Sequence, residues 1–117
     1  PNDIETIGEI RLFLENLRGI TSWVDSDHIL NILLELKGRL PEDKDRMLAL
    51  IDFFLDLPED TQNLFRLGRR LGIMGQLSDL HNEVLVDKVK QTMDQAHVDK
   101  TNIDAVCDRL MIRAIPI

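Results

Sequence analysis

The side chains with the widest range of chemistry are three histidines, His28, His81 and His97, dispersed among many carboxylates. A metal site on a helix needs ligands three or four residues apart, because only those positions share a face. The chain has no His-x-x-x-His or Glu-x-x-His pair, and Asp27 points in a different direction from its neighbour His28. We therefore expect each histidine to be a polar surface residue, and we assign no metal ligand.

The one cysteine and the glycine-containing turn offer no catalytic or phosphate-binding pattern. Cys107 falls on the apolar side of a predicted helix, where a thiol without a neighbouring base is a small hydrophobic residue. The segment Gly72-Ile73-Met74-Gly75 fits neither phosphate-loop pattern, and residues 99–104 lack the central glycine and final glutamate of a calcium loop. The sequence thus predicts no catalytic residue, no cofactor and no enzymatic activity.

Residues 64–73 resemble the first helix and the turn of a helix-turn-helix motif. Gly68 would allow a close approach of two helices, and Gly72 would supply the turn. One face of this helix carries arginines, which bind phosphates and carboxylates well because their donors form a planar fork. This arginine face, within residues 64–72, consists of Arg66, Arg69 and Arg70.

Charge disfavours nucleic acid as the partner of the arginine face. The helix that should follow begins near Gln76 and has no lysine or arginine before Lys88, whereas a recognition helix reads bases and phosphates near its start. The net charge of −7 also repels a phosphate backbone. The same arginines could instead pair with acidic residues of this chain, or dock an acidic surface of a protein partner.

Composition predicts one folded helical domain over residues 1–117. Hydrophobic residues make up 44% of the chain and charged residues 30%, which excludes a disordered protein. Leucine and charged residues favour helices, and the aromatic content of 4% is low for a β-sandwich. The fold class we expect is all-α, a compact bundle or array of five to six helices joined by short turns.

Cysteine usage and hydropathy favour a cytoplasmic protein. A single cysteine allows no internal disulfide, although small secreted domains usually carry several. No apolar run approaches the length of about 18 residues that a membrane-spanning helix needs. The acidic charge also disfavours binding to anionic membrane surfaces.

Six helices can be placed from apolar periodicity and from residues that begin or end helices. Gly19 is placed to end the first helix, and Gly38 ends a second helix that spans about residues 26–37. The tetrapeptide Leu-Pro-Glu-Asp occurs twice and predicts the starts of the third and fourth helices. The expected starts are after Asn2, near Ser26, at Pro41, at Pro58, near Gln76 for a helix reaching Gln95, and at Thr101 or Asn102.

The helices predicted at 26–37 and 41–55 carry apolar faces broader than a surface helix requires. Each covers roughly 200° of the circumference or more, against a stripe somewhat over about 100° on a surface helix. Such helices are either central to the fold or part of an interface, so we expect self-association as a homodimer. The large side chains expected at that interface are Trp23, Phe53 and Phe54.

We therefore expect a non-enzymatic protein–protein interaction or regulatory domain that binds a protein partner or a second copy of itself. The alternative is a helix-turn-helix-like nucleic-acid-binding protein that uses the arginine face. Two lesser alternatives are an acidic mimic of nucleic acid and a small helical enzyme. The mimic would present a row of carboxylates on the third helix, formed by Asp45, Asp52 and Asp56.

Overall fold

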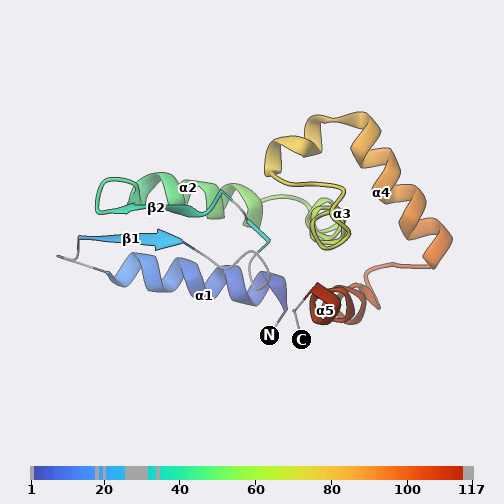
Figure 1. Ribbon diagram of the computed structural model, residues 1–117, viewed down its shortest axis with the longest axis horizontal. Coiled ribbons are helices and arrows are strands. Elements are labelled where there is room, and N and C mark those ends of the chain that lie inside the picture. Colours follow the sequence, from blue (N-terminus) through green and yellow to red (C-terminus); the bar gives the residue numbers. More distant parts are fainter. Residues whose placement is uncertain (1, 18, 20, 26–31, 34, 115–117) are drawn as a thin grey trace. The chain divides into compact units, whose positions relative to one another are not determined.

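The computed structural model describes residues 2–17, 19, 21–25, 32–33 and 35–114 (Figure 1). It is mostly helical, which confirms the helical class, but it also contains two short strands that the sequence did not predict. The bundle arrangement stays a prediction. The elements are α1 (Asp3–Asn16), β1 (Ser22–Asp25), β2 (Lys37–Leu40), α2 (Lys44–Leu55), α3 (Glu59–Arg70), the 3₁₀ helix η1 (Leu77–His81), α4 (Glu83–Ala96) and α5 (Ile103–Ala114).

The chain divides into two compact units, Pro1–Leu57 and Pro58–Ile117. We call them unit 1 and unit 2 and describe each by itself. Unit 1 contains α1, both strands and α2, and unit 2 contains the remaining helices. The single domain expected over residues 1–117 stays a prediction.

The start of α1 follows from its first residues, as the sequence predicted. The Asn2 side chain accepts a hydrogen bond from the Glu5 N–H at 2.8 Å, which satisfies one of the unpaired donors at the helix start. The helix ends at Asn16, earlier than expected, because Leu17 takes an extended conformation. Gly19, the predicted end, does have a positive φ of 68°, but it lies beyond the helix.

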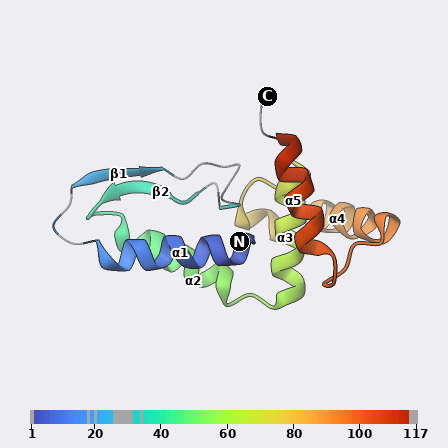
Figure 2. The same ribbon diagram turned by 90° about the horizontal axis from the view of Figure 1, so that it is seen from below.

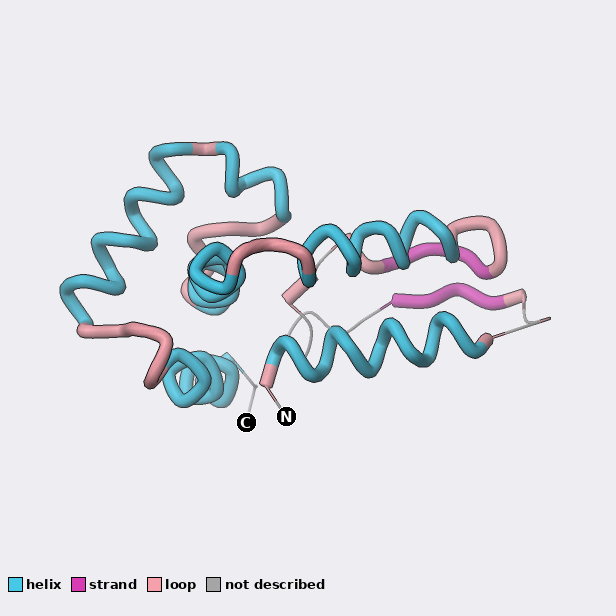
Figure 3. The backbone as a smooth tube through the Cα atoms, turned by 180° about the vertical axis from the view of Figure 1, so that it is seen from behind, coloured by secondary structure: helices cyan, strands magenta, loops and turns pink. Residues whose placement is uncertain are grey.

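The helix predicted over residues 26–37 is wrong wherever the structure describes that segment. Residues 32, 33, 35 and 36 are not helical, and Lys37–Leu40 forms β2, which pairs antiparallel with β1 (Figure 3). Residues 26–31 and 34 of the predicted helix lie outside the described part of the chain. The apolar residues that suggested the helix are still buried, since a short apolar run is compatible with several backbone conformations; these are Ile32, Leu33 and Leu36.

The two copies of Leu-Pro-Glu-Asp adopt different structures. The second copy opens a helix as predicted, with α3 starting at Glu59 directly after Pro58. The first copy ends β2 and makes a turn, so that α2 begins at Lys44 and not at Pro41. This turn is closed by Asp43, whose carboxylate accepts from the Arg39 N–H at 2.9 Å and whose own N–H donates to the Arg39 carbonyl at 2.8 Å.

In unit 1 the strands form one layer and the helix pair α1–α2 forms the other (Figure 2). The Arg11 guanidinium joins the two helices through Asp52, with Nε 2.6 Å from Oδ1, and it also binds Glu15. This ion pair lowers the pKa of the Asp52 carboxyl. The Lys44 ammonium donates to the Leu17 carbonyl at 3.0 Å, close to the end of α1, where carbonyls lack helical partners.

In unit 2 the helix α3 packs against both α4 and α5. The chain leaves α3 through a turn in which the Gly68 carbonyl accepts the N–H groups of Ile73 and Met74, while Gly72 has a φ of 76°. Gly68 itself allows the close approach expected from the sequence. A Cβ at this position would lie 2.9 Å from the Met74 side chain and 3.2 Å from the Val89 side chain.

The helix predicted from Gln76 to Gln95 is divided in two. Asn82 ends η1 and caps α4, because its side chain accepts from the N–H groups of Val84 and Leu85. The expected sixth helix is confirmed as α5, which begins at Ile103 after a turn. In that turn the Thr101 N–H donates to Asp99 at 2.8 Å, a local contact typical of a turn that precedes a helix.

The two helical glycines offer a direct test of the packing at Gly68. We expect Gly68→Ala to lower the free energy of unfolding by about 1–3 kcal/mol, because the added methyl group meets Met74 and Val89. Gly8 lies in α1 with nothing within 4 Å of an added Cβ, so Gly8→Ala should raise that free energy by up to about 1 kcal/mol. Urea unfolding measures both, and equal stability of the two variants would contradict the close approach.

Candidate functional site

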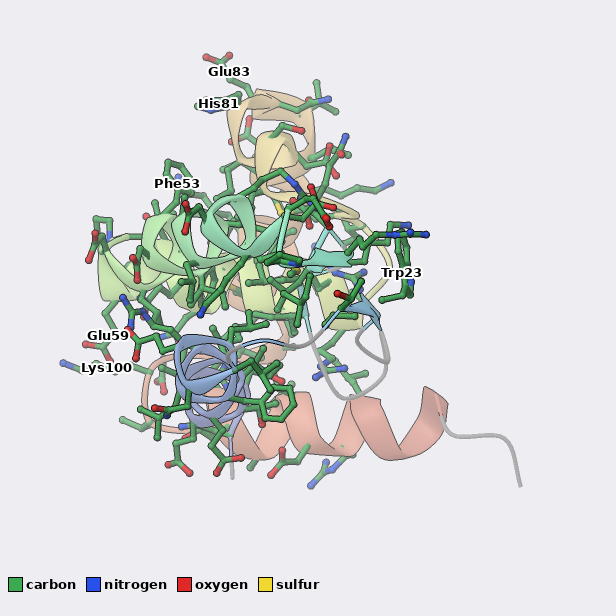
Figure 4. All side chains as sticks on the ribbon, turned by 90° about the vertical axis from the view of Figure 1, so that its left-hand side faces the viewer. Trp23, Phe53, Glu59, His81, Glu83 and Lys100 are labelled. Atoms are coloured by element: carbon green, nitrogen blue, oxygen red, sulfur yellow. The ribbon has the colours of Figure 1, made fainter. Side chains whose placement is uncertain are left out.

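The aromatic side chains predicted to form one interface do not form one patch. Trp23 on β1 is 59% exposed and Phe53 on α2 is 53% exposed, and they project to opposite sides of unit 1 (Figure 4). Phe54 is fully buried, because the inward face of α2 is formed by Met47, Ile51 and Phe54. Phe54 therefore belongs to the core, and the broad apolar face of this helix is only partly exposed.

Sequence reasoning missed an exposed apolar pair on α1. Leu12 and Phe13 are 62% and 59% exposed. The signal was present, since neither residue belongs to the stripe through Ile7 and Leu14 that fixes the buried face of the helix. Val84 is also exposed; it lies in the first turn of α4, which begins at Glu83 after Asn82.

The arginine face is engaged within the chain. Arg66 is buried, and its guanidinium lies 2.7 Å from the Asp104 carboxylate of α5 and 3.2 Å from the Asn63 side chain. Arg69 donates to the Met74 carbonyl at 3.3 Å, and Arg70 is half-buried. Arg66 and Arg69 therefore contact other parts of unit 2, and the roles predicted for the arginine face toward a protein partner or a nucleic acid stay predictions.

An ion pair interrupts the predicted acidic row, and the described histidines lie at the surface. Asp52, the centre of the predicted acidic row, is bound by Arg11, whereas Asp45 and Asp56 are exposed. His81 and His97 are exposed, and His28 lies outside the described residues. Among the residues that the structure describes, no group of three or more histidines, cysteines, aspartates or glutamates could hold a metal ion.

None of the described helices combines the length and the apolar character that crossing a bilayer requires.

Unit 2 contains an open groove between α3 and α4. Its larger part has a volume of about 550 Å³ and is bordered also by the segment that follows α4. Both helices and that segment contribute charged side chains to its walls. The lining residues are Asp60, Asn63 and Leu64 of α3, Lys90, Met93 and Asp94 of α4, and Val98, Asp99 and Lys100.

A second hollow of about 370 Å³ continues the first, because the two share Asp60, Leu64 and Lys90. It adds Thr61 of α3, together with Leu80 at the end of η1 and Val86 of α4. We call the two hollows together the α3–α4 groove. The helices come close at Gly68, and the groove lies along the part of α3 that precedes this glycine.

The α3–α4 groove has an apolar floor and a charged rim. Its apolar members are buried or half-buried, and its charged members are exposed at the rim. Hydrogen bonds from Thr101 lower the pKa of the Asp99 carboxyl, which keeps this group ionised. The described residues that line the groove include no histidine, cysteine or serine.

Comparison of the chain with models of protein families, with curated proteins and with solved structures finds no match in any of the three. The candidate site therefore depends on the geometry of the described residues.

The role of Arg66 can be tested with two aspartates of one helix. We expect Asp104→Ala to lower the free energy of unfolding by about 1–3 kcal/mol, because it leaves the buried guanidinium without its carboxylate. Asp108→Ala removes the same charge from an exposed position one turn later and should change that free energy by less than about 0.5 kcal/mol. Urea unfolding measures both, and similar values would argue against a structural role for Arg66.

Proposed function

We propose that this protein is a non-enzymatic protein-binding domain and that the α3–α4 groove of unit 2 receives a segment of the partner. The observation that carries the proposal is the pair of adjoining hollows with an apolar floor and a charged rim. Apolar side chains from a partner would bury the floor, while the rim charges would stay in contact with water. The proposal includes a regulatory role, and it places the protein in the cytoplasm because small secreted domains usually carry several disulfides, whereas this chain has a single cysteine.

The groove is better suited to a polypeptide than to a small molecule. Pockets for small ligands enclose most of the ligand surface and direct a few polar groups toward it. In this groove the charged side chains are exposed, and the two hollows adjoin each other because they share lining residues. A polypeptide can extend over both hollows, whereas a small ligand in one of them would remain widely exposed to water.

Two apolar residues of α4 allow a matched test of this function. Met93 lines the groove, and Val84 lies nine positions earlier, about two and a half turns, which puts it on the opposite face of the helix. We expect Met93→Glu to abolish capture of the partner from an extract of the native source, because it puts a charge into the apolar floor. Val84→Glu should retain the capture, since Val84 is exposed in any case.

Circular dichroism of both variants shows whether they are folded. The proposed function is contradicted if a folded Met93→Glu variant captures the same partner as the unchanged protein, or if the unchanged protein captures none.

A specific observation also favours self-association, which we propose occurs through α1. Its residues Leu12 and Phe13 expose two large apolar side chains on unit 1, and a homodimer would remove them from water.

Light scattering coupled to size exclusion tests this part of the proposal. We expect the unchanged chain to have twice the mass of one copy and the double variant Leu12→Glu, Phe13→Glu to have the mass of one copy. Val84→Glu changes an equally exposed residue of unit 2 and should remain a dimer. A monomeric unchanged protein would refute self-association without affecting the groove.

A further inference from the structure

We propose that the occupant of the α3–α4 groove is an amphipathic helix of another protein, with lysine or arginine residues on both sides of its apolar stripe. This inference rests on the proposed function and specifies the class of partner. It follows from the walls of the groove, from its length and from the position of its carboxylates.

The walls of the groove favour a helix over an extended strand. A strand binds by adding to the edge of a sheet, where backbone groups are unpaired. Here both long walls are helices, whose backbone donors and acceptors are satisfied within the helix. An extended segment would leave its backbone donors and acceptors unpaired against apolar side chains. In a helix, these groups are already hydrogen-bonded to one another.

The length of the groove fits apolar residues on successive turns of a helix. Val86, Lys90 and Asp94 line it from α4 at intervals of four residues, so the lined stretch spans about 12 Å. Apolar residues separated by four and then three positions extend over about 10 Å on the partner helix. One such side chain would enter each hollow and contact Leu64, which borders both.

The carboxylates stand on both sides of the groove. Asp60 comes from α3, Asp94 from α4 and Asp99 from the segment after α4, and all three are exposed. They outnumber the two lysines of the rim, Lys90 and Lys100. A helix with cations on both flanks of its apolar stripe would therefore face a carboxylate on each side, and the rim charges would also attract it from a distance.

Charge also argues against a second copy of this chain as the occupant. The exposed apolar pair Leu12 and Phe13 lies on an outer face of α1 that also exposes Glu5 and Glu9. Inserting this face into the groove would place those glutamates among Asp60, Asp94 and Asp99 without a surplus of cations. The groove therefore calls for a partner of opposite charge.

Two synthetic peptides test the inference with the full chain. Both are about 18 residues long, about five helical turns, with leucine at positions that share one face; lysine fills the other positions in one peptide and glutamate in the other. Fluorescence anisotropy at about 0.15 M salt, where long-range attraction is screened, measures their dissociation constants. We expect the leucine–lysine peptide to bind and the leucine–glutamate peptide to bind at least about tenfold more weakly.

Charge-reversal variants localise the binding. Asp94→Lys and Asp60→Lys should each weaken binding of the leucine–lysine peptide by about fivefold or more, because each converts an attraction at the rim into a repulsion. Asp108→Lys changes the net charge by the same amount at an exposed position of α5 and should change the affinity by less than about twofold. Lysine at position 94 is also compatible with the last turn of α4, so this variant should fold.

Each other outcome overturns a specific step. Equal weakening by Asp108→Lys would show that bulk charge attracts the peptide and that the groove does not bind it. Tighter binding of the leucine–glutamate peptide would overturn the charge of the partner. If neither peptide binds while Met93→Glu still abolishes partner capture, the helical class of the partner is wrong and the proposed function stands. If Met93→Glu has no effect on capture, the proposed function itself fails.

Discussion

The close approach at Gly68 is the constraint on which the architecture of unit 2 depends. Because this residue has no side chain, Met74 can fold back over the end of α3 and Val89 can bring α4 against the same point. The α3–α4 groove lies along the preceding residues of α3, where side chains such as Leu64 have α4 opposite them but do not fill the space between. The groove therefore follows from the one tight contact between α3 and α4 at Gly68.

Buried and half-buried arginines determine how the helices of both units are paired. Arg66 must have anionic and polar partners because its guanidinium is buried, and Asp104 of α5 supplies the charge. In unit 1 the side chain of Arg11 joins α1 to Asp52 of α2 in the same way, although in a more exposed position. The arginines therefore act as links between helices. In unit 2 this link gives a buried arginine a structural role in an acidic chain.

Local patterns predicted the elements that depend on local contacts. Asn2 at the start of α1 and Pro58 before α3 were identified correctly, because capping and the preference of proline for helix starts act within a few residues. The strands were missed because the pairing of β1 with β2 joins residues that are distant in sequence. Residues 40–43 and 57–60 share one sequence but differ in structure, because the first copy follows β2 and its Asp43 pairs with Arg39 of that strand. The groove could not be predicted because it depends on how α3 and α4 diverge.

The two surfaces proposed for binding differ in shape, and this difference separates their partners. Unit 1 offers protruding apolar side chains, Leu12 and Phe13, which a matching apolar surface can cover without any hollow. Unit 2 offers a hollow, which protruding side chains of another molecule can fill. By shape alone, Leu12 and Phe13 of one copy could enter the α3–α4 groove of another copy. Repeated head-to-tail contacts of this kind would form filaments. The glutamates beside Leu12 and the aspartates of the rim oppose that assembly, so charge gives the groove a specificity that its apolar floor lacks.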